Sequence, residues 1–87
     1  MKFKSVKYLH DYVIEVVLEN GTKKQYDFEK WLFSDINPMF YGFRKITNFK
    51  KVKTHGYLII FGNKANEMEF PYEHLKDMEV KNFQVSV

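Results

Sequence analysis

The chain has 87 residues, of which 45% are hydrophobic and 18% aromatic, so it can form one folded domain and is excluded from the disordered class. Its formal net charge is +3 and its pI is about 9.1. It has no cysteine, which excludes thiolate catalysis, disulfide bonds and cysteine-containing zinc sites and favours a reducing compartment.

The longest uninterrupted apolar run covers residues 57–61, far fewer than the ~20 residues of a membrane-spanning helix. Charged residues also interrupt the N-terminal region of the sequence, so we expect no signal peptide. We therefore expect a cytoplasmic location and no contact with a membrane.

The first third of the chain predicts three β-strands. Residues 3–9 favour an edge strand, and in residues 12–18 every second side chain is apolar or aromatic, which is typical of a strand with one buried face. Asn20-Gly21 follows directly and predicts a two-residue type I′ hairpin that leads into residues 22–28. The side chains expected to face inward are Tyr12, Ile14, Val16, Leu18, Tyr26 and Phe28.

Short helices are predicted for the middle of the chain. Residues 29–34 favour one or two helical turns, and Asn37-Pro38 has the cap residue and the first-turn proline of a helix that ends near Gly42 or Arg44. Residues 47–50 are expected to add a further turn. The side chains expected to pack onto the sheet are Trp31, Leu32, Phe33, Met39, Phe40 and Phe43.

The second half of the chain predicts strands at residues 52–55, 57–61 and 66–70, with turns at His55-Gly56 and Gly62-Asn63, and a helix from Pro71 to about residue 77. The order is β-β-β-α-β-β-β-α. This order predicts the α+β class: an antiparallel sheet of hairpin-connected strands with two or three short helices. Residues 1–79 are expected to form the single domain, and the alternating tail, residues 80–87, favours an extra strand or pairing with another chain.

Several of these residues match a pattern found in a known family. The matching positions are Val6, Tyr8, Leu9, Asp11, Tyr12, Val16, Glu19, Asn20, Gly21, Tyr26, Asp27, Phe28, Trp31, Leu32, Phe33, Phe49, Lys50, Lys51, Val52, Ile60, Asn63, Tyr72 and Leu75. In these positions the chain resembles the small bacterial proteins called domain of unknown function 2442, over roughly residues 6–77. It departs from them near the end, where Phe61 and Asn63-Lys64 replace a common tryptophan and Asn-Gly.

The resemblance implies an antiparallel α+β fold, no established catalysis, and genes in operons that resemble toxin–antitoxin pairs. The residues themselves agree with the lack of catalysis. The three histidines, His10, His55 and His74, have no metal-ligand spacing, and no serine lies in a nucleophile motif. We therefore expect no enzyme activity, no metal and no cofactor.

The charges are distributed unevenly along the chain. Residues 44–53 are basic, and residues 67–79 are mainly acidic. The basic positions are Arg44, Lys45, Lys50, Lys51 and Lys53, and the acidic positions are Glu67, Glu69, Glu73, Asp77 and Glu79.

Two functions are compatible with the sequence. The first is a protein-interaction or accessory module that binds a protein partner or a second copy of itself, with the tail strand as a contact. The second is a nucleic-acid-binding regulatory accessory domain, in which the basic residues contact phosphates and the aromatic side chains among them stack on bases. The same basic residues also suit an ordinary solvated surface.

Overall fold

The computed structural model describes residues 2–81, and within them the predicted order of strands and helices is confirmed. The elements are β1 (Phe3–His10), β2 (Val13–Leu18), β3 (Lys23–Asp27), α1 (Glu29–Leu32), the 3-10 helix η1 (Pro38–Arg44), α2 (Ile46–Phe49), β4 (Val52–His55), β5 (Leu58–Asn63), β6 (Asn66–Pro71) and the 3-10 helix η2 (Tyr72–Met78). From residue 82 onward, the predicted tail strand lies outside the described residues. In the part of the chain that is described, no helix is long and apolar enough to cross a membrane.

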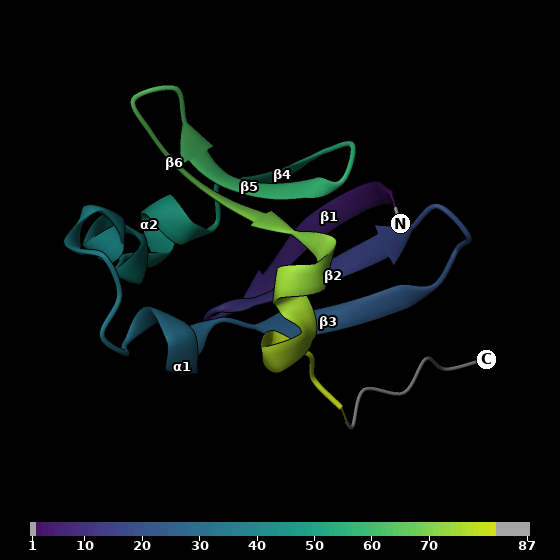
Figure 1. Cartoon of the computed structure of the whole chain (residues 1–87), viewed down its shortest axis with the longest axis horizontal. Helices are drawn as coiled ribbons and strands as arrows, with labels where there is room; N and C mark the ends of the chain where they lie inside the picture. Colours follow the sequence, from purple (N-terminus) through teal and green to yellow (C-terminus); the bar gives the residue numbers. More distant parts are fainter. Residues whose placement is uncertain (1, 82–87) are drawn as a thin grey trace.

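The strands form two antiparallel sheets of three, in the orders β1-β2-β3 and β4-β5-β6, that face each other across the core. Figure 1 shows the second sheet above the first, with α1 and α2 gathered at one end. Strand β1 lies beside β4, and the Phe3 N–H donates to the Gly56 carbonyl at 3.0 Å. On the other side, η2 leads from β6 back to β3.

The chain after η2 is fastened to the outer edge of β3. Glu79 forms an antiparallel bridge with Tyr26, and the Val80 N–H donates to the Gln25 carbonyl at 2.9 Å. A backbone hydrogen bond at a strand edge holds the neighbouring segment in register. The segment of Glu79 and Val80 is therefore placed by the first sheet.

The first hairpin differs by one residue from the predicted two-residue type I′ turn. Val17 pairs with Lys23, and the Leu18 N–H donates to the Thr22 carbonyl, which leaves a three-residue loop in which only Gly21 has a positive φ, of 88°. Directly opposed residues share a face of the sheet. Ile14 and Tyr26 both face inward, so they must oppose each other, and the three-residue loop gives that register.

Two side chains predicted to face the core are exposed instead. Phe33 is 55% exposed because α1 ends at Leu32, and the chain turns away after the buried Leu32 side chain. Met39 is 57% exposed because η1 has 3-10 geometry, in which positions three apart share a face. Phe40 and Phe43 form that face.

The predicted cap is confirmed, since the Asn37 side chain accepts from the Met39 N–H at 3.0 Å.

Four phenylalanines join the two sheets and the helices in the middle of the core. Phe28, between β3 and α1, meets Phe49 of α2, Phe61 of β5 and Phe70 of β6 edge to face, with ring centroids 5.1–5.8 Å apart. Phe49 also stacks on Phe61 at 4.7 Å. Such pairs each add about 0.5–1.5 kcal/mol beyond the burial of their surface. No polar or charged side chain among residues 2–81 is buried with them.

The two turns of the second sheet lie one and two residues after their predicted places. Asn63 pairs with Asn66, so the second turn is Lys64-Ala65, and the predicted turn residues Gly62-Asn63 belong to β5. His55 pairs with Leu58, so the loop contains Gly56 and Tyr57 and lies one residue after the predicted position. At the other end of β5, Gly62 has a φ of 97°, and a Cβ atom there would lie 2.3 Å from the Asn66 carbonyl oxygen. Only glycine combines this conformation with so close an approach of two strands.

We predict that Gly62→Ala lowers the free energy of unfolding by about 2 kcal/mol more than Gly21→Ala. A positive φ strains the backbone of both variants, and only at Gly62 does the new Cβ atom also clash with its neighbours. Gly21 is the matched control. Its φ is also positive, but nothing lies within 4 Å of its Cβ position. Urea unfolding of the two variants measures the difference, and equal losses would contradict the steric account of Gly62.

Candidate functional site

Arg44, the first residue of the predicted basic site, is used to build the fold. Its Nε–H donates to the Leu32 carbonyl at 2.7 Å and its Nη2 donates to the Ser34 carbonyl at 3.1 Å. The guanidinium also lies over the Tyr41 ring, 4.2 Å from the centroid. A cation near the last carbonyls of a helix satisfies their unused acceptors. Arg44 thus holds the C-terminal end of α1, and two of its five N–H donors are engaged there.

The four predicted lysines divide into two groups. The Lys53 ammonium lies 3.5 Å from a carboxylate oxygen of Glu67, so its charge is partly offset by the acidic segment. Lys45, Lys50 and Lys51 are exposed around α2, and no ion pair joins them to another of residues 2–81. Three of the five predicted residues are therefore exposed next to the two ends of α2, without an ion-pair partner among residues 2–81. Their role in nucleic-acid binding stays a prediction.

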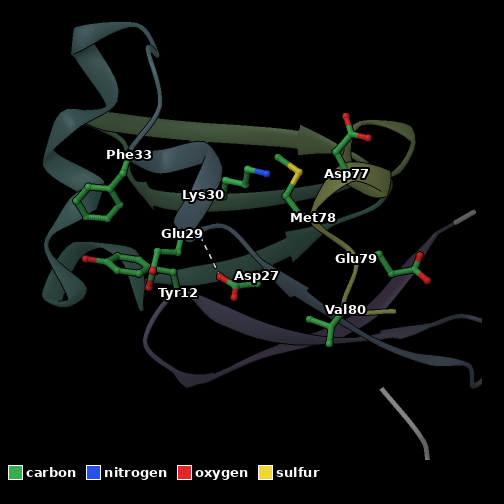
Figure 2. Close-up of a pocket in the computed structure, with 9 residues that line it drawn as sticks. All are labelled: Tyr12, Asp27, Glu29, Lys30, Phe33, Asp77, Met78, Glu79 and Val80. Atoms are coloured by element: carbon green, nitrogen blue, oxygen red, sulfur yellow. Dashed lines mark hydrogen bonds between the residues drawn. The ribbon is translucent and has the colours of Figure 1, made fainter. Parts of the chain in front are cut away.

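A groove with a volume of about 850 Å³ lies between α1 and η2. Figure 2 shows Tyr12 and Phe33 at one end of it and Met78 and Val80 at the other. We call this hollow the acidic groove. Its lining residues are Tyr12, Asp27, Glu29, Lys30, Phe33, Asp77, Met78, Glu79 and Val80.

One wall of the acidic groove is the junction between β3 and α1. The Glu29 N–H donates to the Asp27 side chain at 3.0 Å, the contact drawn as a dashed line in Figure 2. An aspartate in this position satisfies a free N–H group at the start of a helix. The contact fixes the direction in which α1 leaves the sheet, and so it places Lys30 and Phe33 on the groove.

The other wall is the end of η2 and the segment fastened to β3. Met78 is buried and Val80 is half-buried, so both contribute apolar surface, while the Asp77 side chain is exposed. Glu79 lies at the margin, where its carboxylate is 3.3 Å from the Lys24 ammonium. The two walls come from chain segments that are distant in sequence and meet only in the fold.

The groove has four carboxylates and a single ammonium group, on Lys30. A second hollow of about 590 Å³ continues it past Trp31 and shares Asp27, Lys30, Asp77 and Met78 with it. That hollow adds the carboxylate of Glu69 and the imidazole of His74. Together they form an apolar floor with an acidic rim, which favours a cationic chain that also carries apolar side chains.

The acidic groove contains residues that the sequence pattern did not single out. Asp77 and Glu79 belong to the acidic run recognised from the sequence, but Phe33 was predicted to pack onto the sheet, and neither Asp27 nor Glu29 was predicted to be a site residue. Across residues 2–81, no three His, Asp or Glu side chains come close enough together to hold a metal ion.

A polar cluster lies beside the groove at the edge of β3. The Lys24 ammonium donates to the Tyr72 hydroxyl and to the Glu79 carboxylate, both at 3.3 Å. The hydrogen bond to Tyr72 is the main cause that raises the pKa of Lys24, and burial opposes it. Burial also raises the pKa of Tyr26 to about 12, and the neighbouring Lys24 charge lowers it in part. The cluster keeps Lys24 charged and Tyr26 protonated.

No family model matches the sequence, and no curated protein or solved structure matches it either. The resemblance to the domain of unknown function 2442 family therefore stays a prediction that rests on the residues alone.

We predict that stability falls more steeply above about pH 10 in the native chain than in Tyr26→Phe. The folded-state pKa of Tyr26 is raised from 10.0 to about 12, so the unfolded chain loses this proton first. The stability that the Tyr26 hydroxyl contributes is therefore complete below its pKa in the unfolded chain. It is lost as the pH rises through its pKa in the folded chain. Urea unfolding at several alkaline pH values measures it, and parallel pH profiles for the two proteins would contradict it.

Proposed function

We propose that this chain is a non-catalytic protein-binding module whose acidic groove takes up a basic segment of a partner protein. The observation that supports this most is the groove itself: a hollow of about 850 Å³ that is lined by two aromatic and two apolar side chains and by four carboxylates. A small-molecule site would be more enclosed by apolar side chains and have few charges. An open groove with an acidic rim suits a polypeptide chain.

Phe33 is the expected anchor for such a partner. More than half of its surface is exposed, yet its ring is held in place edge to face against Tyr12, with centroids 5.5 Å apart, and Arg44 lies 5.3 Å above it. An aromatic ring that is already fixed loses little conformational entropy when a partner covers it. Rings of this kind carry most of the binding energy in protein interfaces.

The carboxylates select the charge of the partner. Asp27, Glu29 and Asp77 are exposed on the groove, and no ion pair joins them to any other residue from 2 to 81. Rim charges of one sign raise the association rate of an oppositely charged partner and reject one of like charge. We therefore expect the partner segment to carry several lysines or arginines, and its binding to weaken as salt concentration rises.

The alternative function is nucleic-acid binding by the lysines around α2. In its favour, Lys45, Lys50 and Lys51 are exposed next to α2, and none of them forms an ion pair with another residue from 2 to 81. Against it, Arg44 and Lys53 are engaged elsewhere in the fold. Three free charges release fewer counterions than five, so the salt dependence of any such binding would be shallower.

We predict that Asp77→Lys weakens binding of a short fluorescent peptide of alternating lysine and leucine about tenfold, because it reverses a charge on the groove rim. Fluorescence anisotropy at low salt measures the affinity. Glu73→Lys is the matched control, since Glu73 is also exposed on η2 and does not line the groove. The control makes the same change in net charge and is expected to change the affinity less than twofold.

Equal losses in the two variants would show that the peptide responds to net charge alone and would contradict the groove. A single-stranded oligonucleotide is the second probe. If it binds, and Lys50→Glu with Lys51→Glu abolishes this binding while the peptide fails to bind, the nucleic-acid function replaces the proposed one.

We predict that Phe33→Ala lowers the affinity for the same peptide about tenfold and lowers the free energy of unfolding by no more than about 1 kcal/mol, since the ring is largely exposed. Tyr57→Ala is the control, because Tyr57 is equally exposed, at 56%, and lies in the loop between β4 and β5. Anisotropy and urea unfolding separate binding from stability. An unchanged affinity in Phe33→Ala would contradict its role as anchor.

A further inference from the structure

A separate cavity of about 280 Å³ lies at the edge of β3 and shares only Glu79 with the acidic groove. It is formed by β3, η2 and the segment that follows η2. Its lining residues are Lys24, Tyr26, Tyr72, Lys76, Glu79 and Lys81. Three ammonium groups face one carboxylate here, so its charge is opposite to that of the groove.

The cavity also offers hydrogen-bond donors that the fold does not use up. Lys24 donates to the Tyr72 oxygen, so the Tyr72 hydroxyl keeps its own proton for another acceptor. Lys24 makes two contacts, to Tyr72 and Glu79, and an ammonium group has three donors. Tyr26 is only 1% exposed, and it lines this cavity together with Lys24, Tyr72 and Glu79.

Glu79 makes the site selective. A carboxylate repels an anion that has only acceptor oxygens, but it accepts a hydrogen bond from an anion that carries a proton. We propose that this cavity binds a protonated oxyanion of the phosphate class, with Lys24, Lys76 and Lys81 offsetting its charge and Glu79 accepting its P–OH hydrogen. Sulfate has no proton at neutral pH, so it should be rejected.

Phosphate chemistry could come from free inorganic phosphate or from a small phosphomonoester. A phosphomonoester loses its remaining proton with a pKa of about 6. Inorganic phosphate still has a P–OH group well above that pH. The site should therefore take up methyl phosphate only below about pH 6 and inorganic phosphate on both sides of it.

Isothermal titration of the full chain at constant ionic strength tests this, with inorganic phosphate, sulfate and methyl phosphate as the probes. We expect phosphate to bind at least tenfold more tightly than sulfate. Glu79→Gln should reduce this ratio to about one, because an amide can also donate to sulfate. Tyr72→Phe keeps the ring against Phe3 and should weaken phosphate binding several-fold. Circular dichroism of each variant confirms that it is folded.

Lys23→Gln is the matched control for Lys24→Gln, because Lys23 is the preceding residue of β3 and does not line the cavity. The proposal expects only Lys24→Gln to weaken phosphate binding. Three results would overturn it: no saturable binding of phosphate, equal binding of phosphate and sulfate, or equal losses in the two lysine variants. Equal losses in the two lysine variants would mean that the overall positive charge of the protein, and not the cavity, attracts the anion.

Discussion

The contact among Phe28, Phe49, Phe61 and Phe70 is the interaction on which the rest of the structure depends. Phe28 lies between β3 and α1, and Phe49 is the last residue of α2. Phe61 and Phe70 belong to β5 and β6 of the second sheet. No strand pairing joins the first sheet or α2 to the second sheet, so these ring contacts fix the three parts relative to one another. In a chain of this size only a small apolar core can form, so large rings contribute much of the buried area.

The acidic groove follows from that cluster. The Phe28 carbonyl accepts from the Leu32 N–H at 2.8 Å, and Trp31 of α1 meets Phe70 at 5.0 Å, so the cluster sets where α1 lies. The bridge from Glu79 to β3 sets the other wall. Glu79 then stands between two hollows of opposite charge, one acidic and one basic. We infer a module that recognises charge at two neighbouring hollows.

The strands could be predicted from the sequence because apolar side chains alternate along them, and the helix start at Asn37-Pro38 because its cap is local. The predicted register of the first hairpin is wrong by one residue, because Asn20-Gly21 is compatible with loops of two or three residues. Only the shared face of Ile14 and Tyr26 decides between them. The groove could not be predicted, because its walls are residues 27–33 and 77–80, which no local spacing connects. Arg44 was predicted to be a surface charge, because the carbonyl to which it donates belongs to α1 and no local pattern indicates this contact.

The most direct test of the proposed function is a chemical-shift titration of the isotope-labelled chain with the basic peptide. The account predicts saturating shifts of the backbone amides in residues 27–33 and 77–80, with little change around α2. Every one of these positions lies on the acidic groove or next to it. Shifts centred on Lys45, Lys50 and Lys51, or small non-saturating shifts spread over both sheets, would contradict the groove as the binding site.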